Sequence, residues 1–530
     1  MLRDDLNCLL SPWLLLPFIL AWILLAHPIK RLRYPPSPNG LPIIGNLFDI
    51  PVDSPWLKYA ELGKQFGSDV VHFEALGRHV VVLNSAKAAR DLLEKRSSIY
   101  SGRAQSIMLS EITGWHRNWG LWQYNESYKS HRKAFVQHFR PEALPGYYGK
   151  QKKGIHTFLH SLIDAPDDFL AHIQYLTGQV ILDAVYGFEV ARDDPLLALT
   201  EHAAFTLKQI VGANMYLADI IPTFRHIPAW FPGGGYKRRA AEWKKLVGSM
   251  YEEPYRMYKA ALREGTARPC LTSALMSAKG NRASESAELL QVSIAGTTYG
   301  AGAGTTMDTL SAFFFALTLF PETQIAVQDE LDDVLCRERL PIVKDEAALP
   351  RTTAMLYELL RYVELLSASV LFHLIYLESW LTLPGIPHRS TTNDEYNGYL
   401  IPAGSIVIAN AWAMLHDASV FPEPERFDPT RFLAADGSLK GDISLVGEAF
   451  GFGRRICPGR QFARDFVWLA IASILAMFTI EPALDEGGEE LETKVEFTTR
   501  FMRAPLPFKC RITLRFPEAE SLVRSASVDD

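Results

Sequence analysis

A short segment near the C-terminus, residues 450–460, constrains this chain more than any other. Its sequence is FGFGRRICPGR, so that one cysteine, Cys457, stands among glycines, arginines and a proline. Glycine lets a backbone adopt positive φ and lie close to a flat ligand. Neighbouring guanidinium groups favour a thiolate and can pair with carboxylates. The segment therefore indicates a thiolate bound to an iron porphyrin. The competing interpretation is a buried free cysteine in a glycine-rich turn.

Five positions of this segment match a known pattern. Phe-x-x-Gly-x-Arg-x-Cys-x-Gly is filled by Phe450, Gly453, Arg455, Cys457 and Gly459. The pattern resembles the haem-ligand loop of the cytochrome P-450 family. This resemblance implies haem b (iron protoporphyrin IX) as cofactor, Cys457 as the axial iron ligand, and Phe450 and Arg455 as further cofactor-binding residues. An anionic sulfur opposite dioxygen favours O–O cleavage, so the implied activity is that of a monooxygenase.

Two further segments occur in the order that this family shows. Glu358 and Arg361 are three positions apart on a predicted helix, so they share one face. The resemblance implies a third charged member, which we assign to Arg426 in the segment Pro424–Phe427. Such a buried triad costs desolvation, and its value lies in fixing one geometry of the core.

An apolar segment at 289–320 carries a cluster of glycines. Its length approaches that of a membrane span, but the glycines and Asp308 favour a central buried helix. The part around Gly302 and Thr305 resembles the family's oxygen-binding kink, which implies that Gly302 opens the helix and Thr305 holds a proton-delivering water. The family's usual acidic residue is replaced by Gly304. Asp308, one turn further, is a candidate substitute in proton relay.

Three other residues are implied to contact the haem propionates. Tyr128 and Arg132 stand where the family usually has Trp-x-x-x-Arg, and His388 precedes an arginine at a predicted strand start. A guanidinium and a phenol hydroxyl suit a carboxylate partner. The alternatives are a solvated amphipathic helix for the first pair and an ordinary surface histidine for His388.

The N-terminal region predicts a membrane anchor. Residues 9–26 are uncharged and close to the shortest length of a spanning helix. Acidic residues precede this run and basic residues up to Arg33 follow it, which directs the N-terminus to the lumen and the remainder to the cytosol. A cleaved signal peptide is the competing interpretation, but no basic region precedes the run. We expect residues 1–33 to be a single-pass anchor in the endoplasmic reticulum membrane.

The remainder is interpreted as one large domain, because no linker, repeat or low-complexity stretch divides it. A β-hairpin is predicted at 66–84, helical patterns dominate between 86 and 361, and a strand-rich stretch occupies 389–410. The predicted fold class is mainly α with small β-sheets (α+β), the cytochrome P-450 fold. We assign the haem-binding monooxygenase domain to 34–515 and a disordered polar tail to 516–530.

Two aromatic segments are candidates for contacts outside the core. Residues 103–125 hold three tryptophans, and the resemblance implies a variable cap over the substrate pocket, with simple packing as the alternative. Residues 221–235 place Trp230 and Phe231 just before basic residues, which suits a membrane interface. A surface loop packed on the protein's own core explains them equally well.

Composition limits the partners. The net charge of −6 argues against nucleic acid, and five scattered cysteines fit a reduced compartment rather than a disulfide framework. No dinucleotide-binding Gly-x-Gly-x-x-Gly motif follows a predicted strand, so electrons from NADPH are expected through a separate reductase, with cytochrome b5 as an optional second donor. Arg454, Arg460 and Lys133 are candidates for a basic face toward an acidic partner.

Residues 363–379 do not fit the family pattern. Arg361 and His388 are 27 positions apart, where the family has about a dozen, and the extra residues are apolar without glycine or proline. An insertion at an exposed loop would be polar. We interpret these residues as a translated intron or another gene-model error. If they are genuine, the pocket wall is rebuilt or the protein is inactive.

The sequence thus predicts a membrane-anchored monooxygenase that inserts one oxygen atom into a lipophilic small molecule. It resembles fungal members of secondary metabolism. Two alternatives remain open, namely a non-catalytic haem-binding pseudoenzyme and a haem-thiolate isomerase, dehydratase or peroxygenase.

Overall fold

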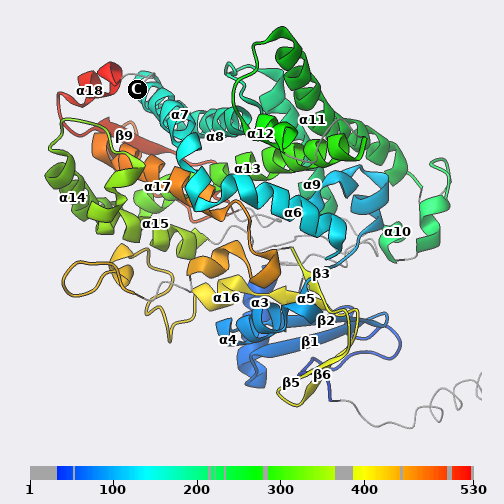
Figure 1. The fold of residues 1–530 in the computed structure, drawn as a ribbon. Coiled ribbons are helices and arrows are strands. Elements are labelled where there is room, and N and C mark those ends of the chain that lie inside the picture. Colours follow the sequence, from blue (N-terminus) through cyan, green and yellow to red (C-terminus); the bar gives the residue numbers. More distant parts are fainter. Residues whose placement is uncertain are drawn as a thin grey trace, which may run out of the picture.

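The computed structural model describes residues 33–51, 54–212, 216–220, 222–231, 234–278, 285–363, 386–441, 446–497 and 504–526. Helices form the larger part of the molecule, and most of the strands lie in a smaller part beneath them (Figure 1). The predicted fold class, mainly α with small sheets, is confirmed by these elements.

In the described ranges, the helices that build most of the larger part share one core. They are α6 (Glu126–Phe139), α7 (Pro145–Asp164), α8 (Phe169–Tyr186), α9 (Pro195–Gly212), α11 (Tyr236–Glu264), α13 (Glu285–Leu319), α14 (Ile325–Leu335), α15 (Pro350–Val363) and α17 (Arg460–Met477). Shorter helices are α3 (Pro55–Phe66), α4 (Ala86–Ala89) with its π-helical continuation η1 (Arg90–Lys95), α5 (Ser97–Tyr100), α10 (Leu217–Ile220), α12 (Leu271–Ser277), α16 (Ala411–Leu415) and α18 (Ala519–Ser525).

Helix α13 is the centre of the core. It packs against α8, α9, α11, α15 and α17, and its Phe313, Phe314 and Phe315 are completely or almost completely buried. A helix that is apolar on all sides is stable only when other elements surround it. The prediction of a central buried helix at 289–320 is therefore confirmed.

The main sheet joins distant parts of the chain in the order β1-β2-β7-β4-β3. Its strands are β1 (Val70–Ala75), β2 (Arg78–Leu83), β7 (Ile406–Ala409), β4 (His388–Arg389) and β3 (Gly102–Arg103). Strands β1 and β2 form the predicted hairpin, with Val70 opposite Leu83. In the antiparallel β3–β4 pair, Arg103 lies opposite His388. This short pairing places two basic residues side by side at the edge of the helical part.

Two small hairpin-like sheets complete the strands. Strands β5 (Asp394–Tyr396) and β6 (Tyr399–Ile401) are joined by Asn397 and Gly398, both with positive φ, as the turn signal predicts. Strand β8 (Phe478–Pro482) pairs with β9 (Cys510–Leu514).

The C-terminal prediction needs correction. Ala519 and Val523 on α18 are completely buried, and Arg524 pairs with Asp164 of α7 at 2.8 Å. The apolar residues of this segment lie four positions apart and face α7 and α17, which overrides its polar composition. The predicted disordered tail at 516–530 is thus wrong for 516–526, and residues 527–530 lie outside the described ranges.

Two sequence predictions fall largely outside the described residues. Of the anchor at 1–33 only Arg33 is described, and of the segment 363–379 only Val363, the buried last residue of α15. Within the described ranges no single helix is long and apolar enough to cross a bilayer. Helix α13 and Pro321–Leu335 meet that criterion only as a pair, which is bent by 109°.

Candidate active site

The cysteine loop is closed by its own backbone and held against η1. The Cys457 N–H donates to the carbonyl oxygen of Phe450 at 2.8 Å. Gly453 begins the 3-10 turn η12 (Gly453–Arg455) with a φ of 53°, and a Cβ on it would lie 2.1 Å from the Leu93 carbonyl oxygen. Glycine is therefore required there, both for the left-handed backbone and for the close approach to η1. The contribution of Phe450 that the structure shows is its carbonyl group.

Cationic groups surround the sulfur. Burial raises the pKa of the Cys457 thiol above its ordinary value, and a backbone hydrogen bond from Gly459 and the charges of Arg132 and Arg460 act in the opposite direction. Coordination to a metal ion deprotonates a thiol outright. The loop therefore suits a thiolate, which would form when the sulfur coordinates an iron ion.

Three buried or half-buried arginines, Arg103, Arg132 and Arg455, converge beside this loop with His388. In the described part of the chain, none of the three guanidinium groups pairs with a carboxylate. Arg103 Nε and Arg455 Nη1 are buried without a hydrogen-bond partner there. Burial and the neighbouring Arg455 lower the pKa of Arg103 to about 9. Buried like charges need an anion, so the two propionates of haem fit this cluster in charge and in hydrogen-bonding capacity.

Arg455 is fixed by backbone carbonyls and by an aromatic ring. Its Nε donates to Ser101 at 2.8 Å and its Nη2 to Trp122 at 2.6 Å. Its guanidinium carbon lies 3.8 Å from the ring centroid of Tyr128, a distance suited to a cation–π contact. The free Nη1 is thereby left for a ligand.

Tyr128 and Arg132 on α6 contact the same loop. The Tyr128 hydroxyl donates to the Arg454 carbonyl at 3.2 Å and accepts from Arg132 Nη1 at 3.2 Å. Arg132 Nη2 donates to the Ile456 carbonyl at 2.8 Å. The structure thus brings both predicted residues to the cysteine loop, and the solvated-helix alternative does not apply to them.

His388 belongs to the cluster as well. Its Nδ1 lies 2.8 Å from the carbonyl oxygen of Tyr100, and burial, together with the charge of Arg103, lowers its pKa to about 3. The ring is therefore neutral, with Nδ1–H as donor. A carboxylate beside it would raise this pKa, because an opposite charge favours the cation. The surface alternative fails because the side chain is buried.

Sequence reasoning missed Arg103. It lies in β3 at the start of the irregular 103–125 stretch, and its Nη1 donates to the carbonyls of Ile386 and Pro387. Only the β3–β4 pairing reveals this position, since nothing in the local sequence separates it from a surface arginine.

The charged core triad contains a different arginine from the predicted one. Glu358 and Arg361 are completely buried and form a bidentate pair at 2.7 and 2.8 Å. Arg361 also donates to the backbone carbonyls of Leu415 and Arg426, at 3.1 and 3.3 Å. Only the backbone of Arg426 takes part in this contact.

The third member is Arg431. Its Nε lies 3.5 Å from Glu358 Oε1, with the side chain 10% exposed. The side chain of Arg426 is 56% exposed and faces Glu322 at 3.9 Å. The sequence holds two Arg-Phe pairs five positions apart, and the prediction took the first. The 3-10 turn η10 (Pro429–Phe432), which packs on α15, selects the second.

Helix α13 passes its glycine-rich part without interruption of the α-helical pattern. A Cβ on Gly302 would lie 2.7 Å from Ile181 Cδ1, so this glycine lets α8 approach. The Thr305 hydroxyl donates to the Ala301 carbonyl at 2.9 Å. A Cβ on Gly304 would meet no atom within 4 Å. The catalytic roles of Gly302 and Thr305 therefore stay predictions, while Gly304 borders open space.

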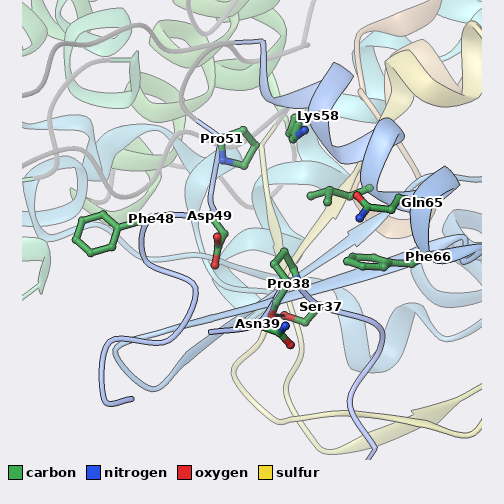
Figure 2. A pocket seen from close by; sticks show the side chains of 10 residues that line it. Ser37, Pro38, Asn39, Phe48, Asp49, Pro51, Lys58, Gln65 and Phe66 are labelled. Carbon is green, nitrogen blue, oxygen red and sulfur yellow. Dashed lines mark hydrogen bonds between the residues drawn. The ribbon is translucent and has the colours of Figure 1, made fainter. Parts of the chain in front are cut away.

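A cavity of about 710 Å³ lies elsewhere, between residues 37–51 and α3 (Figure 2). Phe48, Lys58 and Phe66 are among its lining residues. No residue of the cysteine loop or of the arginine cluster lines it.

Comparison with known proteins agrees with this geometry. The sequence profile described as Cytochrome P-450 matches residues 35–375 and 380–511. Cytochrome P-450 monooxygenase 98 of Postia placenta is 37% identical over 513 residues, which cover 96% of this chain and 95% of the relative. Cytochrome P-450 monooxygenase ple1 of Rhodocybe pseudopiperita is 37% identical, with 94% and 92% covered. Tryptamine 4-monooxygenase of Psilocybe cyanescens is 34% identical, with 95% and 96% covered.

Proposed function

The chain belongs to the cytochrome P-450 family as a haem-thiolate monooxygenase related to fungal enzymes, and from this premise we propose that it oxidises a lipophilic small molecule of secondary metabolism. The observation that carries the proposal is the buried arginine cluster beside Cys457, in which no carboxylate pairs with a guanidinium within the described ranges. Neither a disulfide framework nor a plain structural cysteine accounts for that arrangement.

When bound, the haem supplies oxygen activation, which a thiolate ligand favours. The protein's own residues position it. The closed loop around Cys457 aims the sulfur, and Arg103, Arg132 and Arg455 neutralise the propionates. Thr305 on α13 is our candidate to hold a water molecule, and no described atom fills the space beside Gly304, one residue earlier.

Electrons are proposed to come from NADPH through a separate reductase, with cytochrome b5 as an optional second donor. Arg454, Arg460 and Lys133 are exposed, and they lie on the cysteine loop and on α6, on the side of the molecule that carries the thiolate. Exposed cations there support docking of an acidic redox partner.

A membrane location is proposed for two reasons. The apolar run 9–26 leads into the domain, and Trp230 and Phe231 are 81% and 47% exposed. Ile43 and Phe48, close to the N-terminal linker, are 92% and 76% exposed. Large apolar side chains at such exposure suit a lipid interface. We propose a single-pass protein of the endoplasmic reticulum whose catalytic domain faces the cytosol.

Residues 363–379 remain interpreted as a gene-model error. The family profile matches 363–375 and is interrupted only at 376–379, so the interpretation rests on the apolar sequence and on the length of the interval between Arg361 and His388. Sequencing the transcript tests the interpretation directly, and an mRNA that encodes all of 363–379 would overturn it.

The function is tested with the full chain in membranes, together with a fungal reductase and NADPH. The panel contains terpenoid, polyketide and aromatic compounds, including tryptamine because one relative is a tryptamine 4-monooxygenase. We expect one substrate for which NADPH and O2 consumption match oxygenated product, with Cys457→Ser as the inactive control. Carbon monoxide binding without any turnover would identify the pseudoenzyme. Product formation that needs no O2 would identify the isomerase, dehydratase or peroxygenase alternative.

A further inference from the structure

Two consecutive carbonyl groups at the end of α5 hold two residues of the candidate site. The Tyr100 carbonyl accepts from Nδ1–H of His388 at 2.8 Å. The Ser101 carbonyl accepts from Nε of Arg455, also at 2.8 Å. The position of this piece of backbone therefore sets the direction of two side chains that are assigned to the haem.

The bond to Tyr100 also decides the tautomer of His388. A neutral imidazole carries a hydrogen on one ring nitrogen and a lone pair on the other, and a hydrogen bond at one nitrogen selects the form. Because Nδ1–H donates to the Tyr100 carbonyl, Nε2 is the nitrogen that is left for a propionate. A carboxylate near Nε2 favours uptake of a proton there, since an opposite charge favours the cation.

The other end of Tyr100 is held by a carboxylate. Its side chain is completely buried, and its hydroxyl donates to Asp394 Oδ2 at 2.9 Å. The same oxygen accepts from Arg96 Nη1 at 2.8 Å. Burial, followed by the bond to Asp394, raises the pKa of Tyr100 above its ordinary value, so the hydroxyl stays protonated and donates. A hydrogen bond to an ionised carboxylate is stronger than one between neutral groups.

Asp394 and His388 belong to one short segment that encloses the end of α5. Asp394 begins β5, and His388 begins β4. Between them, Thr391 bonds to the Ile99 carbonyl through its backbone N–H at 2.9 Å and through its hydroxyl at 3.0 Å. Tyr100 is thus bonded to the start of this segment through its carbonyl and to the end of it through its hydroxyl.

We propose that Asp394 is a positioning residue for the haem. Through the Tyr100 hydroxyl it fixes the Tyr100 carbonyl, and that carbonyl holds His388 with Nε2 available to a propionate. Arg96 neutralises the carboxylate, so the pair adds no net charge to the arginine cluster. The inference rests on the proposed function, because only a haem protein gives His388 such a partner, and it deepens the assignment of that same site.

The first test measures the rate of haem loss from the haem-loaded full chain to an excess of apomyoglobin. Asp394→Ala is expected to accelerate haem loss roughly fivefold, and Asp394→Asn, which keeps one acceptor oxygen, should lie between this variant and the wild type. Tyr100→Phe removes the hydroxyl but keeps the ring and the carbonyl, so the fold is retained. Its haem loss should be roughly threefold faster than that of the wild type.

Asp345→Ala is the matched control. Its side chain is 12% exposed and bonds to Arg339 at 2.7 Å, whereas that of Asp394 is 14% exposed and bonds to Arg96 at 2.8 Å. The other side-chain bond of Asp345 within the described ranges goes to the backbone N–H of Ile342. This variant removes a comparable ion pair, and its haem loss should stay at the wild-type rate.

The second test is a double-mutant cycle between Asp394 and His388, which separates positioning from a general loss of stability. His388→Ala alone should accelerate haem loss roughly tenfold, because it removes a hydrogen bond to a charged group. Adding Asp394→Ala to this variant should then change the rate by less than about 1.5-fold, since the carboxylate acts through the missing ring.

Three results would overturn the proposal. Haem loss at the wild-type rate in both Asp394→Ala and Tyr100→Phe would show that the carboxylate does not support the site. Rates that multiply in the double variant would show that Asp394 stabilises the fold without positioning His388. A wild-type rate in His388→Ala would remove the residue through which Asp394 acts.

The failure of the proposed function looks different. A wild-type chain that binds haem but oxidises no substrate would refute the monooxygenase, while the haem-loss rates would still decide the role of Asp394. A wild-type chain that takes up no haem would refute both.

Discussion

The cysteine loop and the stretch 103–125, which we call the cap, are held in different ways. On the cysteine side, Arg455 and Arg132 bond to backbone carbonyls of the loop and to its neighbours in space, and Tyr128 lies between them. The cap is held by separate contacts to remote segments, such as Ser106 to Asp219, Trp115 to Thr206 and Arg117 to Ser293. Several side chains therefore bond to the backbone of the loop and of its neighbours, whereas each cap contact involves a different segment that is remote in the sequence.

The cysteine loop and the cap differ because they contact different ligands. A haem presents the same iron and the same two propionates in every protein that binds it, so the chemistry dictates a thiolate and cations. A substrate varies, and the segments that cover it need only close over its shape. We therefore expect changes on the cysteine side to alter cofactor binding and stability, and changes in the cap to alter rates.

The largest effect is expected from the core triad beneath the cysteine side. Arg431→Ala removes the second cation near Glu358 and the donor to three backbone carbonyls. Because Arg361 stays paired with Glu358, we expect a loss of unfolding free energy at the lower end of the about 3–5 kcal/mol that breaking a buried ion pair costs. Arg426→Ala is the matched control, because that side chain is 56% exposed and should cost less than about 0.5 kcal/mol. Urea unfolding and haem content measure both. Equal losses of unfolding free energy in the two variants would contradict the assignment of Arg431 as the third member of the triad.

The arginine cluster gives the next largest effect. A substitution there is expected to weaken haem binding but to stabilise the haem-free protein. Arg103 is a buried cation without a carboxylate partner in the described residues. Arg103→Leu should lower haem affinity by about 1.5–3 kcal/mol, the range for a hydrogen bond to a charged group. Without haem the same variant should unfold at a higher urea concentration, because an uncompensated buried charge is gone.

Arg454→Leu provides the control for this cluster, since Arg454 is an exposed cation of the same loop. Its haem affinity should equal that of the wild type. A haem affinity in Arg103→Leu that also equals the wild type would remove Arg103 from the cofactor site.

The contact between η1 and the cysteine loop predicts a pH dependence. Glu448 on η11 (Val446–Phe450) is buried and lies 2.9 Å from Arg90 Nη2. Burial raises the pKa of its carboxyl from 4.5 to about 7. The folded chain then binds the proton more tightly than the unfolded chain, so stability present at low pH is lost as the pH rises from about 4.5 to 7.

Glu448→Gln should remove this loss. We expect its unfolding free energy to exceed that of the wild type by about 1–3 kcal/mol at pH 8, with a smaller difference near pH 5. Glu126→Gln, at an exposed carboxylate, should follow the wild-type profile. Parallel profiles of Glu448→Gln and wild type between pH 5 and 8 would contradict the raised pKa.

The same contrast explains what the sequence could reveal. Cys457, Arg455, Tyr128 and Arg132 were predicted because the cysteine loop and the helix 127–139 resemble family patterns in residue type and spacing, and the structure brings them together. Arg103 was missed because its position follows from a two-residue strand pairing with a segment almost 300 positions away. Such pairings depend on the whole fold, and no local pattern encodes them.

Elsewhere, a local sequence pattern gave a wrong prediction because only tertiary packing distinguishes the possible residues or structures. Arg426 and Arg431 both precede a phenylalanine, and only the docking of η10 on α15 separates them. The polar composition at 516–526 predicted disorder, while the two buried residues of α18 were sufficient to dock it. The hairpin at 66–84 was predictable from its alternation of apolar and polar residues. The buried helix at 289–320 was predictable from a long apolar segment that glycines and Asp308 make unsuitable for a membrane span.

The smallest effect concerns Gly304 on α13. Gly304 stands where the family usually has an acid, and a Cβ there would meet no atom of the described residues within 4 Å, so a side chain can begin at this position. In Gly304→Asp, we expect the fraction of NADPH converted into product to rise about two- to threefold, less than ~1 kcal/mol in barrier terms. Peroxide release, measured beside product, should fall correspondingly.

Gly304→Ala separates this proton-relay effect from helix stabilisation. Replacing glycine by alanine in a helix interior stabilises by about 0.5–1 kcal/mol, and aspartate shares part of that gain without being a better helix former than alanine. If the alanine variant improves coupling as much as the aspartate variant, rigidity of α13 is responsible and the acid is not. If neither changes coupling while Asp308→Asn lowers it, Asp308 already performs the relay one turn further along the helix. In that case Asp308 would take the role that the family usually gives to an acid at the position of Gly304. The difference in how the cysteine loop and its surroundings are built would then concern the cap and not α13.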